Sequence, residues 1–89
     1  RLTVEPFEHG SMRVAISDKG DLSDVPSDGK ILDGQTLILW WPTVEEGYEV
    51  GSVLMNGTDI TEQFFSGTYN HVVKGDVNVT VTIRKKRMD

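Results

Sequence analysis

The chain has 89 residues, a formal net charge of −5 and no cysteine. This length suits a single domain with a small core, and the acidic balance argues against a nucleic-acid partner and against anionic lipid, because both favour basic surfaces. The absence of cysteine excludes disulfides and thiolate chemistry, and no apolar run approaches the ~20 residues of a membrane-spanning helix, so we expect no membrane insertion.

The N-terminal part predicts two short strands. Residues 2–7 favour a strand, and Pro6 restricts it to an edge or a strand end because proline has no backbone N–H to donate. Residues 9–11 then predict a turn. In residues 12–17 apolar and polar side chains alternate, which indicates a second strand. A tight turn between the two would make them antiparallel.

Residues 18–35 are rich in Asp, Gly and Ser, and they predict a long exposed loop that returns once to the core at Ile31 and Leu32. Calcium binds clustered carboxylates beside a turning glycine, although the spacing here does not fit the helix-loop-helix calcium template. We interpret the segment as a plain acidic loop. The alternative is a weak calcium site formed by Asp18, Asp21 and Asp24.

Two further strands are predicted in the middle of the chain. Residues 35–41 predict a strand, and the continuous apolar run within it, residues 37–41, indicates that both of its faces are covered. Residues 48–55 indicate the next strand, in which Gly51 and Ser52 interrupt the alternation and predict a bulge. The Asn-Gly pair at residues 56–57 predicts a tight type I′ hairpin turn, which needs positive φ at both positions.

The C-terminal part predicts a short helical turn and two strands. Asp59 followed by Glu62 resembles a capping box at the start of the helical turn. Residues 68–73 favour a strand, and the strict alternation of residues 77–83 predicts a last strand with one buried face. Residues 84–89 hold a basic cluster and are interpreted as a tail or linker, so the expected domain covers residues 1–83.

This series of motifs resembles the divergent B-repeat modules of internalin-type and related bacterial surface proteins. The matching segments are residues 2–4 with Gly10, residues 34–42, residues 47–48, residues 55–57 and residues 77–81. The resemblance implies a mainly β domain, with a small β-grasp-like sheet of about five to six short strands and one short helical turn. An immunoglobulin-like β-sandwich is the alternative, and it needs about seven strands.

The resemblance also orients the strand at residues 35–41. Alignment through Pro42 implies that Thr36, Ile38 and Trp40 point inward. Leu37, Leu39 and Trp41 then point outward and form an apolar stripe, and such patches often mark interaction surfaces. The alternative is that the long loop at residues 18–35 or the turn at residues 59–65 covers this stripe and makes it a second small core.

No catalytic or cofactor site is expected. His9 and His71 are the only histidines, and neither has a partner at a metal-binding or catalytic spacing. We therefore expect no enzyme. The hypothesis is a noncatalytic interaction or spacer module of a bacterial cell-surface or secreted protein, whose partners are neighbouring domains of a longer chain and a protein or glycan ligand. The chain starts at Arg1 instead of Met, which agrees with a piece of something longer.

The expected contact residues are Leu37, Leu39, Trp41 and Tyr69. A carbohydrate-binding module is the alternative function, with Trp41 and Tyr69 as platforms on which sugar rings stack.

Overall fold

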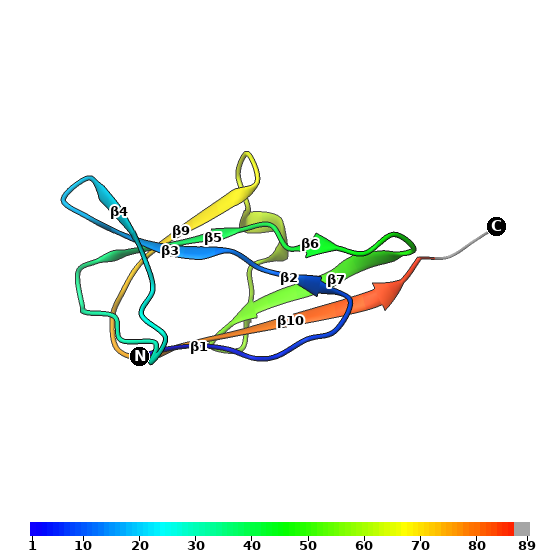
Figure 1. Ribbon diagram of the computed structural model, residues 1–89, viewed down its shortest axis with the longest axis horizontal. Coiled ribbons are helices and arrows are strands. Elements are labelled where there is room, and N and C mark those ends of the chain that lie inside the picture. Colours follow the sequence, from blue (N-terminus) through cyan, green and yellow to red (C-terminus); the bar gives the residue numbers. More distant parts are fainter. Residues whose placement is uncertain (87–89) are drawn as a thin grey trace.

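The computed structural model describes residues 1–86, which form ten strands and one 3-10 helical turn (Figure 1). The N-terminal strands are β1 (Leu2–Val4), β2 (Gly10–Ser11), β3 (Val14–Asp18) and β4 (Asp21–Asp24). The central strands are β5 (Thr36–Trp40), β6 (Thr43–Val44) and β7 (Tyr48–Met55). The remaining elements are β8 (Thr58–Asp59), the helical turn η1 (Thr61–Gln63), β9 (Thr68–Val72) and β10 (Val77–Lys85).

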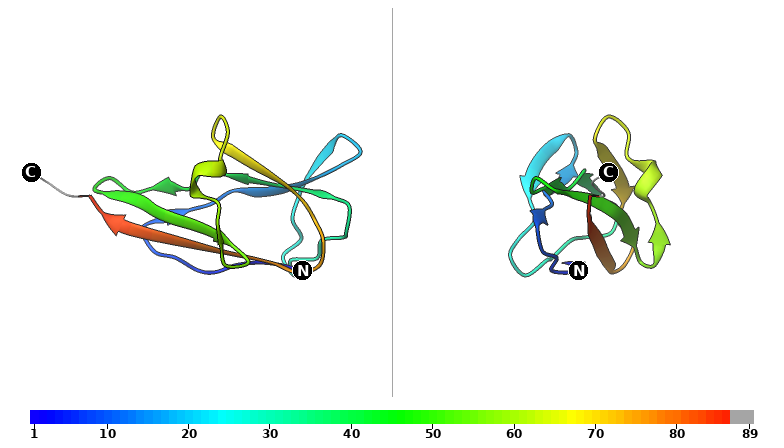
Figure 2. Two further views of the ribbon diagram at one scale, coloured as in Figure 1. Left: turned by 180° about the vertical axis from the view of Figure 1, so that it is seen from behind. Right: turned by 90° about the vertical axis from the view of Figure 1, so that its right-hand side faces the viewer.

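The strands form two four-stranded sheets and one small ladder. The first sheet has the order β1-β10-β7-β8, the second has the order β4-β3-β5-β9, and β2 pairs with β6. Seen along the long axis, the strands lie around a common interior (Figure 2). The prediction of a small, mainly β domain with one short helical turn is confirmed. The strands are divided between two four-stranded sheets and the β2–β6 ladder, where a single small sheet of about five to six strands was expected.

One apolar core joins the two sheets. In β10 the predicted alternation is confirmed, with Val77, Val79 and Val81 buried and the residues between them exposed. Leu37 and Leu39 of β5 contribute to the same buried cluster from the other sheet. Because each sheet buries only one face, neither sheet has a complete core without the other.

The first strand pairs differently from the prediction. β1 lies parallel to β10, with Leu2 opposite Val77 and Val4 opposite Val79. β3 instead pairs with β4 and β5 in the second sheet, so the predicted antiparallel pair of the first two strands was wrong. Pro6 cannot donate to a ladder, and residues 5–13 carry the chain from β1 through β2 to β3 in the second sheet (Figure 1).

The bulge and the hairpin turn of β7 are confirmed. Ser52 pairs with Thr82 and Val50 with Ile83, which leaves Gly51 as the extra residue. Asn56 and Gly57 have φ angles of 51° and 82°, as a type I′ turn requires.

The acidic segment contains a strand that was not predicted. β4 pairs with β3 through a tight turn in which Lys19 and Gly20 have positive φ, and all four residues of β4 are exposed. The predicted return to the core is confirmed, because Ile31 is buried while Leu32 is exposed. The Asp-Leu-Ser-Asp sequence of β4 has little strand propensity. Only the turn at Lys19 and Gly20 indicates the hairpin in the sequence.

The helical turn and the C-terminal boundary also differ in detail. The residue that precedes η1 is Ile60, and no side chain caps it. Asp59 instead accepts hydrogen bonds from the backbone N–H and the hydroxyl of Thr61. β10 continues through Arg84 and Lys85, two residues beyond the predicted domain boundary at residue 83. The last three residues of the predicted tail, 87–89, lie outside the described part.

The domain is elongated, with extents of 47 × 23 × 22 Å. Arg1 and the start of β10 lie toward one end of the long axis, where the β3–β4 hairpin projects beyond them, and the last residues of β10 lie toward the other end (Figure 1). Within residues 1–86 there is no helix of the length and apolarity needed to cross a bilayer.

Candidate functional site

The orientation predicted for β5 was wrong. Leu37 and Leu39 have exposed fractions of 0%, whereas Ile38 and Trp40 are only half-buried on the opposite face. A register error of one residue moves every side chain of a strand to the other face, and the alignment through Pro42 made this error. Leu37 and Leu39 therefore belong to the core and cannot contact a ligand.

Trp41 is partly exposed, as predicted, but its surroundings come from other elements. The residue follows the end of β5, has an exposed fraction of 39%, and donates its backbone N–H to the carbonyl of Gly67 at 2.8 Å. The Phe64 ring meets its indole edge-on, with the ring centroids 5.1 Å apart. Phe64 in turn contacts Tyr69 at 5.8 Å. We call Trp41, Phe64, Phe65 and Tyr69 the aromatic ledge.

Phe65 is the most exposed aromatic residue of the ledge, with an exposed fraction of 85%. It begins a tight turn in which Phe65 and Thr68 exchange backbone hydrogen bonds of 2.6 and 3.0 Å. The two residues between them have positive φ, as in a type I′ turn. This turn projects from the side of the molecule at the top of Figure 1, so a rigid backbone presents an apolar ring to solvent.

Tyr69 has a supporting position. It lies opposite Leu39 on β9, is half-buried, and packs against the core cluster. Of the four predicted contact residues, the structure thus brings together Trp41 and Tyr69, with Phe64 between them. The prediction missed Phe64 and Phe65. A usable signal was present, because two adjacent phenylalanines directly precede Ser-Gly, a dipeptide that favours a tight turn.

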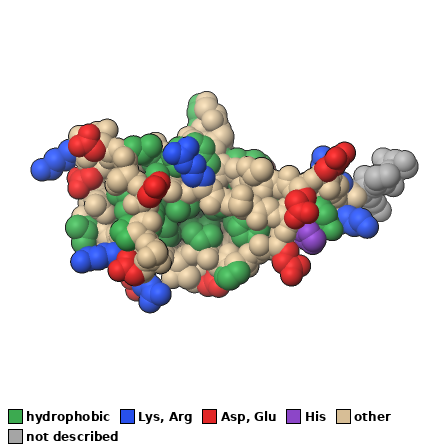
Figure 3. Space-filling view, in the orientation of Figure 1, with side chains coloured by type: hydrophobic (Ala, Val, Ile, Leu, Met, Phe, Trp, Pro, Cys, Tyr) green, Lys and Arg blue, Asp and Glu red, His purple; other side chains and the backbone are tan. Residues whose placement is uncertain are grey.

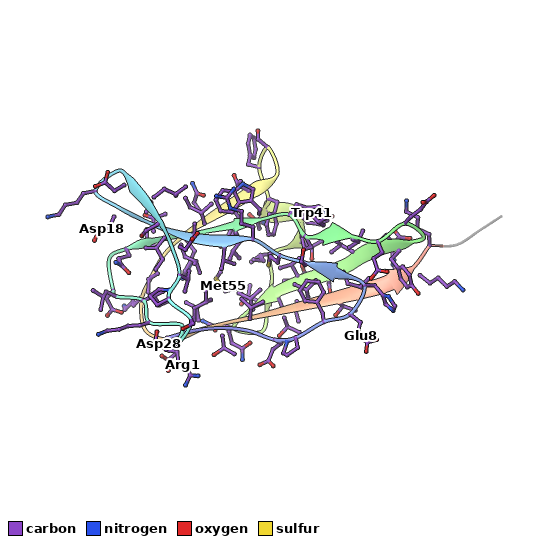
Figure 4. All side chains as sticks on the ribbon, in the orientation of Figure 1. Arg1, Glu8, Asp18, Asp28, Trp41 and Met55 are labelled. Atoms are coloured by element: carbon purple, nitrogen blue, oxygen red, sulfur yellow. The ribbon has the colours of Figure 1, made fainter. Side chains whose placement is uncertain are left out.

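The predicted calcium candidates do not converge. Asp18 and Asp21 are paired across the β3–β4 hairpin, but Asp24 lies three residues after Asp21 and therefore on the opposite face of β4. In residues 1–86 no group of three or more His, Cys, Asp and Glu side chains is arranged to hold a metal ion. Figure 4 shows Asp18 at the hairpin end and Asp28 beside Arg1.

Other aspartates stabilise backbone turns. Asp28 accepts a hydrogen bond from the N–H of Lys30 at 3.0 Å, and Asp33 accepts one from the N–H of Gly75 at 2.9 Å. The hydroxyl of Thr61, followed by its backbone N–H, holds the pKa of Asp59 below its usual value. These carboxylates therefore have local structural partners.

His9 has a packing role that the sequence did not indicate. Its ring stacks on Tyr48 with the centroids 3.9 Å apart and the planes 9° from parallel. Its Nδ1 lies 3.5 Å from a carboxylate oxygen of Glu45. His71 lies on β9 opposite Leu37, whereas His9 lies in the bend that precedes β2.

Two hollows of the described surface are lined by residues outside the aromatic ledge. A polar one of about 410 Å³ lies beside the β7 bulge and is lined by Asp59, Thr61 and Glu62 among others. A second one of about 320 Å³ lies between β1 and β3, and its walls include Val4 and Val14. Figure 3 shows the face of the molecule that is seen in Figure 1. On this face apolar side chains gather along the middle, and acidic side chains lie mostly toward the two ends of the molecule.

No protein-family model, curated protein or solved structure matches this chain significantly.

Proposed function

We propose that this chain is a noncatalytic spacer and interaction module of a bacterial cell-surface or secreted protein, placed between neighbouring domains of a longer chain. The observation that carries the proposal is the position of the two chain ends. β1 starts beside the first residue of β10, and β10, a strand of nine residues, finishes about 30 Å away toward the other end of the elongated domain (Figure 1). A domain with this arrangement separates whatever precedes it from whatever follows it.

The proportions of the molecule support a spacer. Its radius of gyration is 13.5 Å, whereas a compact chain of this length has about 12 Å. β10 runs through nine residues along the long axis and pairs with strands on both sides. Because hydrogen bonds hold β10 on both sides, this strand is a continuous support along the length of the domain.

The interaction part of the proposal rests on the aromatic ledge. Phe65 and Trp41 expose apolar rings, and exposed aromatic residues on rigid backbone are frequent anchors of protein interfaces. The tight turn fixes the backbone of Phe65 before any partner binds, which lowers the entropic cost of association.

The spacer role can be tested with two copies joined in tandem. Small-angle X-ray scattering should give a maximum dimension greater than that of one copy by about 30 Å, the length of the nine-residue strand β10 that separates the two points of attachment. A tandem with a long Gly/Ser linker provides the control, because its copies can reorient. A two-copy protein no longer than a single copy would contradict the spacer proposal.

A carbohydrate-binding module is a second candidate, and the partial exposure of the Trp41 indole favours it. Two variants of the aromatic ledge can be compared for binding to a glycan array. Trp41→Ala should abolish binding if sugars stack on the indole, whereas Phe65→Ala should leave it. Binding that is insensitive to Trp41→Ala would exclude this candidate.

A further inference from the structure

We propose that β1 and β10 form a mechanical clamp that resists force applied through the two ends of the chain. The inference rests on the proposed spacer function, because a spacer between two attached domains carries any tension between them. The clamp depends on the direction in which this tension acts on the hydrogen bonds between β1 and β10.

Tension through the chain ends shears the β1–β10 pair. The two strands are parallel and both start at the same end of the molecule, with Leu2 opposite Val77. The force on β1 acts at its first residue, while the force on β10 acts at its last residue, at the opposite end (Figure 1). The two strands are therefore pulled past each other along their own direction, and the bonds between them share the load.

The contacts between β1 and β10 are suited to this load. The Arg1 carbonyl accepts a hydrogen bond from the N–H of Val77 at 2.9 Å, and the N–H of Glu5 donates to the Val79 carbonyl at 2.8 Å. These two bonds enclose the three residue pairs of the ladder. The Asn78 amide also donates to the Glu5 carboxylate at 3.1 Å. A backbone hydrogen bond thus closes the β1–β10 ladder at each of its two ends.

Burial protects these bonds from water. Leu2 has an exposed fraction of 6% and its partner Val77 has 1%, and Val79, the partner of Val4, has 0%. The N–H of Leu2 is bonded on the other side to the carbonyl of Gly29 at 2.6 Å, which ties β1 to the acidic segment. Sliding β1 along β10 would expose these apolar side chains, so the apolar contacts oppose shear together with the hydrogen bonds.

β1 is the part of the clamp that yields first. On its other side β10 pairs with β7 through seven residue pairs, against three pairs with β1. Both ladders are sheared by the same force, and the shorter one has fewer bonds to share it. Detachment of β1 is therefore the expected first step of unfolding under tension.

The clamp can be tested by single-molecule force spectroscopy with two pulling directions. The chain has no cysteine, so Glu46→Cys provides a unique attachment point on an exposed residue. Pulling between the two chain ends shears β1 from β10. Pulling between residue 46 and the C-terminus instead separates β10 from β7 one pair at a time, because Lys85 lies opposite Tyr48 at the same end.

We expect the end-to-end unfolding force to exceed the other force by a factor on the order of two to three at equal loading rate, since about three residue pairs share the load. Both measurements use the same Glu46→Cys protein, so its stability cannot account for a difference. Equal forces, or a weaker end-to-end direction, would overturn the clamp.

A pair of variants at residue 5 assigns the resistance to the β1–β10 ladder. Glu5→Pro removes the N–H that bonds to Val79, whereas Glu5→Ala keeps this N–H and removes the side chain. Glu5→Pro should lower the end-to-end force more than Glu5→Ala does. Glu5→Pro should also lower the end-to-end force more than it lowers the force measured between residue 46 and the C-terminus. An equal loss in both directions would mean general destabilisation and no clamp. The scattering experiment on the tandem tests the spacer function separately, so either proposal can fail alone.

Discussion

At the scale of single residues, a few backbone positions with positive φ set the shape of this domain. The pairs Lys19-Gly20, Asn56-Gly57 and Ser66-Gly67 each close a two-residue turn with positive φ at both positions. Such turns match the twist of the strands that they join. Asn56 also accepts a hydrogen bond from the N–H of Asn78 at 2.7 Å, so its side chain connects the turn to β10.

Gly57→Val tests the turn at the end of β7. A Cβ at Gly57 would meet no atom within 4 Å, so the effect comes from φ alone. With φ at 82°, we expect a loss of about 1–3 kcal/mol in the free energy of unfolding. Gly29→Ala is the comparison, because there a Cβ would also collide with the carbonyl oxygen of Leu2. Urea denaturation measures both, and an unchanged midpoint for Gly57→Val would contradict the turn type.

Asp59→Asn tests the carboxylate beside η1. Its pKa is lower in the folded chain because Thr61 donates to the ionised form. The contribution to stability is therefore present above the unfolded pKa of about 4 and is lost as pH falls through the lower, folded pKa. We expect the variant to be less stable than the native chain at pH 7 and the difference to shrink below about pH 4. Thermal melts from pH 2 to 7 measure this, and a difference independent of pH would contradict it.

At the scale of elements, the sequence predicted local features better than pairings between distant segments. The bulge at Gly51, the Asn-Gly turn and the alternation of β10 each depend on a few adjacent residues, and all were predicted. The parallel β1–β10 pair joins residues more than 70 positions apart, and no local pattern specifies it. For the candidate site, the exposure of Trp41 was predicted, but the one-residue orientation error at β5 placed Leu37 and Leu39 on the wrong face.

The edge strands differ in how they are protected against pairing with another chain. β1 is followed by a charge and Pro6, β4 carries two aspartates, and β8 has two residues. Such features limit edge-to-edge association. β9 contains no Asp, Glu, Lys or Arg, and Val72 has an exposed fraction of 64%. Since Val73 and Gly67 bond toward β5, alternation directs the backbone groups of Asn70 and Val72 toward the open edge.

Val72→Lys should therefore reduce self-association of the chain at high concentration. A lysine on an edge strand opposes the approach of a second edge, and because Val72 is exposed, the melting temperature should stay nearly the same. Sedimentation velocity over a range of concentrations measures the effect. Leu22→Lys on β4 is the control, since Leu22 is also exposed but its strand already carries charges. Equal effects of the two variants would exclude a special role for the β9 edge.

At the scale of the whole molecule, the two sheets depend on one core. Leu37 from β5 and Val79 from β10 both have exposed fractions of 0% and belong to the same cluster. Each sheet has its apolar face against the other, so separating them would expose both faces to water at once. The domain is therefore expected to unfold as one cooperative unit despite its elongated shape.

Truncation in one sheet should consequently destabilise the other. Val79→Ala removes apolar volume from the first sheet and should cost about 2 kcal/mol, whereas Trp40 and Trp41 report by fluorescence on the end of β5 in the second sheet. In urea the fluorescence midpoint should fall by the same amount as the circular dichroism midpoint, which reports on strands of both sheets. Leu37→Ala is the matching change in the second sheet and should cost about 2–5 kcal/mol, again with coincident transitions. If Val79→Ala lowered the circular dichroism midpoint but left the fluorescence midpoint in place, the sheets would unfold independently, and tension on β1 and β10 would not be transmitted to the rest of the domain.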